Sequence, residues 1–529
     1  MKAKNILSIF AIFALSLGSC DKGFVEKNTN PLLATTIDPA YELVSAQIIA
    51  LNIVHYEGCI VQQAQHLLGG AEEGGNRNTW QDRYSNNHFN ALYGNQIRNL
   101  VDIINMTKDN PAKSNLYNMA RILKAYSFQM LVDRYGDVPY SEAGLGYLRT
   151  TNADGTTTLS RINFPKYDEQ RVIYDDIAKE LKEAVDALDA TKDNVSQEMY
   201  FGGNIPRWKK FGNSLLLRVG MRYTKVDPVK AKSIVQIATD PARGGVMTSN
   251  SDNVVLKCNS IQNNPSNDFI NGSVRYIWHV GKPFVDFLKV NNDPRLKYIA
   301  ALYPNPSSST NPGTPNTNPA SQIGCPYGYT DVNITTAPGY PGKIGNAFKY
   351  SQFNRSTIGR IDAWLYYVTY AQTQLLMAEA RYRNYITTGE VKDYYESAIK
   401  AHMTQVDTWS SSGAASPITT AEQNAYLLEP AIAYNPAQAL KQINEQYWVA
   451  SLMIWGEAWA NFRRSGYPQL QPINFPGEDA AVAISTGGDG FIHRLQYSLK
   501  EWSVNPDNVK AAADRIGGDN MKTRVFWDL

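Results

Sequence analysis

The chain has 529 residues, of which 43% are hydrophobic, so it is long and apolar enough to bury a large core. Lysine and arginine number 51 against 49 aspartate and glutamate residues. This near-neutral balance argues against a nucleic-acid partner, because such partners bind a strongly basic face. No apolar run beyond residue 20 approaches the roughly 20 residues that a membrane-spanning helix needs.

The first 20 residues have the pattern of an export signal. Lys2 and Lys4 form a basic start, and an apolar run over residues 6–17 leads to Leu-Gly-Ser-Cys, which ends at Cys20. The run is too short to span a bilayer, and the small residues after it mark a cleavage site. The motif resembles a bacterial lipobox, in which the cysteine is acylated and becomes the first residue of the mature chain. An ordinary secretory signal with a chance cysteine is the alternative.

We therefore predict a lipoprotein signal peptide over residues 1–19, lipidation at Cys20 and a polar tether over 20–38. Loss of Lys2 and Lys4 with the signal leaves equal numbers of basic and acidic residues. The mature protein is then formally neutral and held at the membrane by its lipid alone.

Helical periodicity recurs along the rest of the chain. Apolar residues spaced three and four apart predict helices over residues 39–67, 86–107, 114–135, 168–189, 206–225, 228–239, 361–386, 390–406 and 436–464. The helix over 114–135 has the clearest apolar face and stops at Gly136, a normal helix-terminating residue. We predict one mainly α domain over 39–529 that resembles tetratricopeptide-like stacking of helix pairs, although no strict 34-residue repeat is present.

The segment from about 240 to 360 differs in character from the helical parts. Short β-prone runs occur at residues 253–257 and 274–280, among many Asn, Gly, Pro and Ser residues. Residues 303–345 are nearly all loop formers, with five prolines between 304 and 319. We predict a loop-rich insertion that carries a few short strands.

Neither the cysteines nor the histidines have metal-ligand spacing. Cys59, Cys258 and Cys325 allow at most one disulfide, and buried thiols are the preferred interpretation. No phosphate-binding loop or nucleophile-elbow motif is present. We predict no cofactor and no metal, and leave open calcium bound by backbone and carboxylate oxygens.

Two further patterns have both a structural and a functional interpretation. Asp133 and Asp137, four residues apart at a helix end, could form an acid/base pair, but we expect them to bond nearby backbone or Arg134. Tryptophans recur within the helix predicted over 436–464, at positions 448, 455 and 459, as a core stripe or a partner face. Trp364 is expected to begin a helix and to lie in the core.

A block from Asp133 to Ala143, Asp-Arg-Tyr-Gly-Asp-Val-Pro-Tyr-Ser-Glu-Ala, resembles a signature of the SusD/RagB family. These are lipid-anchored nutrient-binding proteins of Bacteroidetes outer membranes. Further blocks resemble the family in the same order, at residues 28–31, 208–222, 379–380, 445–468 and 517–528. One departure lies at residues 494–498, where the prolines of a family turn are missing and the local loop geometry is in doubt.

The resemblance implies a helical, non-catalytic binding protein at the cell surface. It would capture an oligosaccharide, or a peptide, and deliver it to a SusC-like TonB-dependent outer-membrane barrel. A ligand-free accessory subunit of the transporter is an alternative, and a surface glycoside hydrolase or lyase is another. An enzyme of that kind needs two carboxylates about 5–10 Å apart across a cleft, and no such pair stands out in the sequence.

Aromatic residues are plentiful, with 32 tyrosines and 10 tryptophans, which suits a sugar ligand with apolar ring faces. The Gly-rich loop from Gly69 to Tyr84 is the first candidate site, and the comparable region contributes to the ligand site in family members. The insertion is the second candidate. The predicted ligand-binding residues are Asn76, Arg77, Asn78, Trp80, Tyr84, Tyr276, Trp278, Tyr327 and Tyr329, with Tyr340 beside them. Alternatively, each aromatic side chain packs its own loop down.

Overall fold

The computed structural model describes residues 38–49, 55–68, 75–151, 157–159, 162–409, 416–472 and 489–529. The predicted signal peptide and Cys20 lie outside these residues, as does the predicted tether up to residue 37. Across the described residues, none of the helices is both long and apolar enough to cross a membrane. The helices are α3 (Pro39–Ile49), α4 (His55–Ile60), α6 (Asp82–Ala91), α7 (Arg98–Thr107), α8 (Ser114–Tyr135), α9 (Gln170–Ala187), α10 (Ile205–Arg222), α11 (Pro228–Ala238), α12 (Ser266–Asn271), α13 (Lys282–Val290), α14 (Leu296–Ile299), α15 (Tyr370–Tyr382), α16 (Val391–Val406), α17 (Thr420–Tyr426), α18 (Ala439–Ala450), α19 (Trp455–Ser465), α21 (Leu499–Val504) and α22 (Pro506–Arg515).

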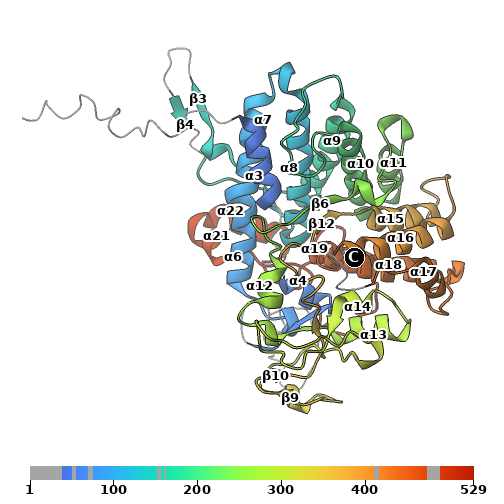
Figure 1. Ribbon diagram of the computed structural model, residues 1–529. Coiled ribbons are helices and arrows are strands. Elements are labelled where there is room, and N and C mark those ends of the chain that lie inside the picture. Colours follow the sequence, from blue (N-terminus) through green and yellow to red (C-terminus); the bar gives the residue numbers. More distant parts are fainter. Residues whose placement is uncertain are drawn as a thin grey trace, which may run out of the picture.

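Helices that follow one another in the chain pack side by side. Helix α8 packs against α7 and α9, and α10 packs against α9 and α11. A second group is formed by α15, α16, α18 and α19, and α10 contacts α15 between the two groups. Figure 1 shows the first group above and the second to the right. The predicted tetratricopeptide-like arrangement of helix pairs is confirmed.

Helix α8 is enclosed on nearly every side, since 18 of its 22 residues are buried. It therefore carries polar side chains such as Gln129, Asp133 and Arg134 into the interior together with its apolar ones. The helix ends at Gly136, whose φ of 76° lies in the left-handed region that favours glycine. The predicted bounds of this helix are confirmed.

Helices α9, α10, α11 and α16 agree with the predicted ranges to within a few residues. The helix predicted over 86–107 already begins at Asp82 and contains a π-helical turn over Leu92–Ile97. The single helix predicted over 39–67 is wrong, because the chain forms α3, α4 and the strand β1 (Ala64–His66) there. The helix predicted over 436–464 is two helices, α18 and α19, separated at residues 451–454.

The start of the helix predicted over 361–386 is also wrong. Residues Leu365–Val368 form strand β12, which pairs antiparallel with β6 (Val254–Leu256), and α15 begins only at Tyr370. The sequence Leu-Tyr-Tyr-Val has aromatic and β-branched residues, so this local β propensity and the partner strand outweigh the helical spacing. Trp364 consequently precedes a strand, and its side chain is half-buried instead of lying in the core.

The insertion has the predicted character of short strands among loops. It lies in the lower part of Figure 1, opposite α8 to α11. In the described part of the chain each sheet has two antiparallel strands, and an isolated parallel bridge joins Gly281 to Cys325. The strands outside those already named are β2 (Val138–Pro139), β3 (Arg149–Thr151), β4 (Thr157–Leu159), β5 (Tyr167–Asp168), β7 (Trp278–Val280), β8 (Ala300–Ala301), β9 (Lys343–Ile344), β10 (Ala347–Phe348) and β11 (Gln352–Phe353).

Both remaining patterns are structural, but the partners expected for Asp133 and Asp137 are partly wrong, because Arg134 pairs with Glu57 instead. The tryptophans at positions 448, 455 and 459 are all buried in the core, although on α18 and α19 and not on one helix. Asp133 accepts hydrogen bonds from Trp527 at 3.2 Å and Arg222 at 3.2 Å, whereas Asp137 accepts from the Gln170 N–H at 2.9 Å. The three cysteines of the described residues are buried thiols.

Buried ion pairs join helices that are distant in sequence. Arg464 on α19 donates to both carboxylate oxygens of Glu379 on α15, at 2.8 and 2.7 Å, and both side chains are 1% exposed. Burial alone would raise the pKa of Glu379, but Arg464 and Arg383 lower this pKa to about 2. The carboxylate is therefore charged in the folded protein at neutral pH, and its pair ties α15 to α19.

Replacing Glu379 by glutamine keeps the side-chain shape but leaves the buried Arg464 guanidinium without its counter-charge. We expect Glu379→Gln to lower the free energy of unfolding by about 3–5 kcal/mol, as for other broken buried pairs. Urea unfolding followed by circular dichroism measures this change. Asp514→Asn is the control, because the exposed Lys510–Asp514 pair at 2.6 Å should contribute less than about 1 kcal/mol. Equal losses in the two variants would contradict the role of the buried pair.

Candidate functional site

Strand β1, just before the predicted ligand loop, pairs with the insertion. His66 lies opposite Trp278 and Ala64 opposite Val280 in the antiparallel register of β1 and β7. The Leu67 N–H donates to the Ile277 carbonyl at 3.2 Å, and the Leu67 carbonyl accepts from the Asp331 N–H at 2.7 Å. The first predicted region thus adjoins both aromatic segments of the second, around residues 276–278 and 327–331.

The described part of the loop, residues 75–84, is fixed by bonds to the scaffold. The Asn76 amide donates to the His66 carbonyl, and the Asn78 amide donates to the Gly490 carbonyl. Asn78 has a φ of 53°, a left-handed conformation that asparagine tolerates better than most residues. The Tyr84 ring stacks on Tyr56 with 4.3 Å between ring centroids. Residues 69–74 of the predicted loop lie outside the described residues.

Burial divides the predicted ligand-binding residues into two sets. Buried side chains are those of Asn76, Asn78, Tyr84 and Trp278, which have exposed fractions of 0%, 1%, 8% and 3%. These four pack inside the protein, so their contact with a ligand stays a prediction. Half-buried side chains are those of Arg77, Trp80, Tyr276, Tyr327, Tyr329 and Tyr340. Trp80 and Tyr276 pack against the main core. Tyr329 and Tyr340 pack against a smaller hydrophobic cluster around Cys325 and Phe348.

Two histidines and a tyrosine of this region are uncharged at neutral pH. Burial lowers the pKa of His279 to about 3 and that of His88 well below its usual value, so both imidazoles are neutral. Burial raises the pKa of the Tyr327 hydroxyl to about 12, so it stays protonated and can both donate and accept. The half-buried Tyr327 suits a ligand with hydroxyl or amide groups, whereas both imidazoles are buried.

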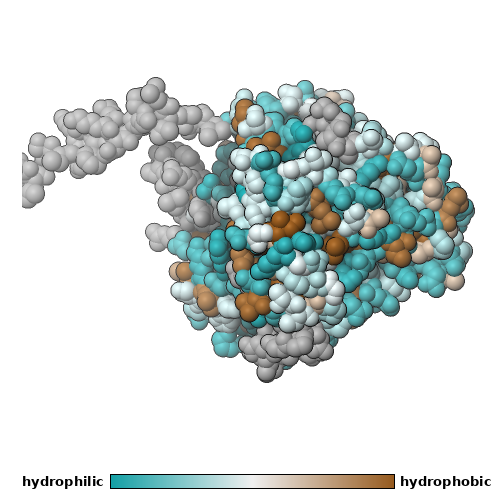
Figure 2. Space-filling model, turned by 60° about the horizontal axis from the view of Figure 1, so that its bottom comes forward, coloured by the Kyte–Doolittle hydropathy of each residue, from teal (hydrophilic) through white to brown (hydrophobic). Residues whose placement is uncertain are grey.

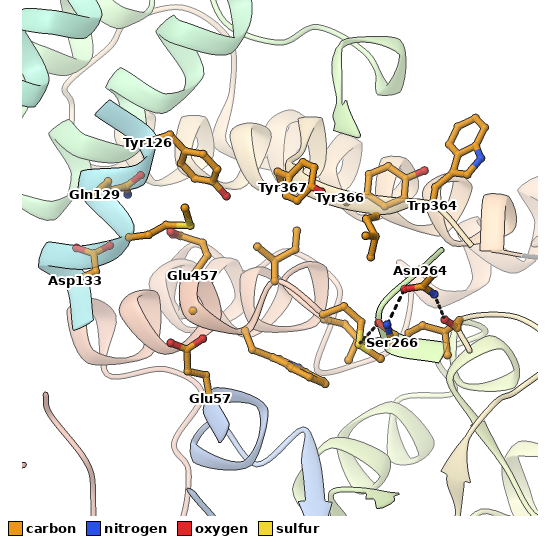
Figure 3. A pocket seen from close by; sticks show the side chains of 18 of the residues that line it. Glu57, Tyr126, Gln129, Asp133, Asn264, Ser266, Trp364, Tyr366, Tyr367 and Glu457 are labelled. Atoms are coloured by element: carbon orange, nitrogen blue, oxygen red, sulfur yellow. Dashed lines mark hydrogen bonds between the residues drawn. The ribbon is translucent and has the colours of Figure 1, made fainter. Parts of the chain in front are cut away.

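The structure also contains a cleft that the sequence did not indicate. It has a volume of about 80 Å³ and lies among α8, α10, β12, residues 264–266 and the start of α19. Figure 3 shows the rings of Tyr126, Tyr367, Tyr366 and Trp364 in a row along one side and Glu457 and Glu57 on the other. The only sign of this cleft in the sequence is the spacing of Tyr126, Gln129 and Asp133 on α8, which places them on one helix face.

The acidic groups of this cleft are paired with arginines. Glu57 accepts from the Arg134 Nη2 at 2.9 Å, and Glu457 accepts from the Arg222 Nη2 at 2.7 Å. Burial would raise the pKa of Glu457, but Arg218 and Arg222 hold this pKa below its usual value. The two glutamates are thus structural anions and not a pair of carboxyl groups poised for acid and base chemistry.

The face of the molecule in Figure 2 has few large apolar areas. Hydrophilic residues dominate this face, and hydrophobic ones form small separate groups across it. A ligand bound on this face would meet polar and aromatic side chains more than aliphatic ones. The half-buried tyrosines and tryptophan of the two predicted regions have this mixed character.

The family comparison agrees with the arrangement of helices and insertion. Residues 26–487 match the SusD-like family that is described as "Starch-binding associating with outer membrane". The chain belongs to the SusD-like family. The resemblance inferred from the sequence blocks is therefore confirmed, as is the fold class. This SusD-like chain falls in a family of nutrient-binding proteins of the outer membrane.

Solved structures resemble the SusD-like chain over almost its full length. A chitin-binding protein is 28% identical with a TM-score of 0.76, and the match covers 93% of this chain and 100% of that one. A SusD-like protein from Bacteroidetes is 27% identical, with the same coverage and TM-score. A chitin-binding SusD homologue from Flavobacterium johnsoniae is 22% identical, covers 93% and 98%, and has a TM-score of 0.72, which supports the fold alone. A search of curated proteins found no match.

Buried His279 makes folding sensitive to acid. Its pKa is about 3 in the folded protein and about 6.5 in an unfolded chain, so the unfolded state binds more protons between these values. The stability contributed by neutral His279 is complete above pH 6.5 and is lost as the pH falls. The free energy of unfolding falls between pH 7 and pH 4.5. We expect this fall to be about 2–3 kcal/mol smaller for the SusD-like chain with His279→Gln than for the parent. Urea unfolding at both pH values measures this, and equal losses would contradict it.

Proposed function

We propose that this SusD-like protein captures an oligosaccharide at the cell surface and passes it to a SusC-like TonB-dependent outer-membrane barrel. The supporting observation is the set of backbone bonds that joins residues 64–67 to the insertion at 277–280 and 331. It brings two aromatic-bearing segments of a nutrient-binding family member side by side. Its relative with 28% identity is a chitin-binding protein, which favours a glycan ligand.

The proposed ligand surface consists of Trp80, Tyr276, Tyr327, Tyr329 and Tyr340. Each ring is half-buried, so it is held in place yet keeps a free part on which the C–H face of a sugar can stack. Because four of these rings, all but that of Tyr327, are already packed against buried clusters, little of their conformational entropy is lost on binding. Arg77 and the tyrosine hydroxyls would add hydrogen bonds to sugar hydroxyls.

The buried members of the predicted set act as supports in this proposal. The Asn76 and Asn78 amides hold the loop to β1 and to residue 490, and Tyr84 stacks beneath its end on Tyr56. Trp278 contacts His66 with 4.5 Å between ring centroids. These contacts fix the orientation of the neighbouring exposed rings, as a second layer around a binding site does.

The two alternative functions, an accessory subunit and a glycosidase, predict different structural features. A ligand-free accessory subunit would bury Trp80 and the insertion tyrosines, whereas all five rings are half-buried. A glycosidase would need two carboxyl groups with free access to a substrate, whereas Glu57 and Glu457 are paired with arginines. A binding protein without catalysis therefore fits the family and these contacts best. Modest affinity is expected, since a delivered ligand must also be released.

Trp80 is the aromatic ring whose loss tests the proposed surface. We expect Trp80→Ala to weaken oligosaccharide binding by at least about tenfold, because a central stacking ring is removed. Isothermal calorimetry against a panel of glycans and peptides measures this, and chromatography of the ligand afterwards checks for cleavage. Tyr382→Ala is the control, since this exposed ring lies on helix α15 of the scaffold. Equal binding by the two variants would contradict the site, and cleaved products would contradict the function.

Lipid attachment at Cys20 is tested separately. We expect Cys20→Ala to shift the protein from the membrane fraction to the soluble fraction, because the described residues have no helix able to cross a membrane. Fractionation with immunoblotting, and labelling with a clickable fatty acid, measure the shift. Absence of label on the parent protein would contradict lipidation at Cys20, and membrane retention of the unlabelled variant would contradict the lipid as the only attachment.

A further inference from the structure

The cleft beside α8 contains buried polar groups that make no hydrogen bond within the structure. Gln129 is 1% exposed, and neither the nitrogen nor the oxygen of its amide has a partner. The hydroxyl of Tyr367, which is 6% exposed, also has none. Both residues line the same cleft (Figure 3). Because an unpaired buried polar group is costly, such groups indicate a bound molecule that supplies the missing bonds.

One wall of the cleft is aromatic. Tyr126, Tyr367, Tyr366 and Trp364 stand in a row from the interior to the mouth of the cleft (Figure 3). Tyr366 and Trp364 are half-buried, and the Trp364 ring lies 4.7 Å from the Lys257 ammonium group. Flat rings in a row offer stacking surface to a ligand with an apolar face.

The charges around the cleft cancel one another. Three carboxylates line it, those of Glu57, Asp133 and Glu457, and they pair with Arg134, Arg218 and Arg222. An ionic ligand buried deep in the cleft would bring a charge for which no counter-charge is left there, since Lys257 is exposed beside Trp364, and burying such a charge is unfavourable. The cleft therefore selects a neutral ligand with hydrogen-bonding groups.

The cleft is separated from the proposed ligand surface by a layer of core rings. Trp455 lines the cleft, and its ring centroid lies 6.1 Å from that of Phe269. The Phe269 ring centroid in turn lies 5.1 Å from that of Trp278 on β7, which pairs with β1. A molecule in the cleft and one on the Trp80 surface would occupy different sites.

We infer that this cleft is a second sugar-binding site, which takes a single neutral pyranose ring. The ring stacks on the row of aromatic side chains, and its hydroxyls bond the Gln129 amide and the Tyr367 hydroxyl. A volume of about 80 Å³ excludes a chain of rings. The inference rests on the proposed function, since it adds a monosaccharide site to an oligosaccharide-binding protein.

Titration with neutral monosaccharides tests this site. The purified lipoprotein, held in a detergent without a sugar headgroup, is titrated with glucose, galactose and N-acetylglucosamine, and with glucuronate as the charged comparison. We expect one neutral monosaccharide to bind with a change in tryptophan fluorescence, which Trp364→Phe reduces. Glucuronate should bind at least tenfold more weakly than that sugar. Gln129→Leu should weaken the binding about tenfold and Tyr367→Phe about fivefold, since each removes hydrogen bonds to the sugar.

Stability and a matched variant distinguish binding from structure. Gln129→Leu removes an unpaired amide, so the Tm of the sugar-free protein should stay equal or rise. Tyr350→Phe is the control, because its hydroxyl is likewise buried and without a partner but lines a different cavity. Its monosaccharide affinity should equal that of the parent. A fall in Tm for Gln129→Leu would overturn the inference by showing that the amide is structural.

The outcomes also separate this inference from the proposed function. Monosaccharide binding that survives Trp80→Ala but falls in Gln129→Leu supports the cleft. Oligosaccharide binding lost in Trp80→Ala, with no monosaccharide bound or with equal affinity in Gln129→Leu, overturns the cleft and leaves the proposed function standing. Absence of binding to any sugar overturns both. A crystal soaked in the sugar that shows only ordered water beside Gln129 overturns the cleft alone.

Discussion

The fold depends on arginine–carboxylate pairs that are buried between helices distant in sequence. Arg134 on α8 pairs with Glu57 on α4, and Arg222 on α10 pairs with Glu457 on α19. In each case a buried guanidinium and a buried carboxylate are paired, so neither helix can shift without leaving a buried charge unpaired. The pairs therefore fix the spacing of the helix groups in a way that apolar packing alone does not.

The two candidate binding regions lie around this fixed framework. Helix α4 leads into β1, and β1 pairs with β7 of the insertion. The scaffold therefore fixes the positions of the rings near Trp80 and Tyr276. The cleft arises on the other side of Trp455, where α8 and β12 approach without filling the space between them. Rigid surroundings let aromatic rings stay partly open without collapsing onto one another.

The sequence places aromatic rings in both candidate segments but does not decide how deeply each ring is buried. Trp80, Tyr276 and Tyr327 are half-buried, as a ligand surface needs, whereas Asn76 and Trp278 of the same segments are buried. Neighbours in a loop or strand point to different sides, and only the strand register decides which side faces the core. The cleft is not evident from the sequence because helical spacing predicts residues 366 and 367 within a helix. They lie instead on strand β12, which pairs with β6 across more than a hundred residues.

The sequence by itself determined the helices whose apolar faces repeat over many turns, above all α8 with its end at Gly136, because local spacing and capping are sufficient for these. Its ordered blocks also determined the SusD-like family. Only the tertiary structure decided that residues 365–368 form a strand, that the helix predicted over 39–67 is divided, and that Gln129 faces a cleft. These outcomes depend on partners brought from far along the chain, and such long-range contacts leave no periodic signal in the local sequence.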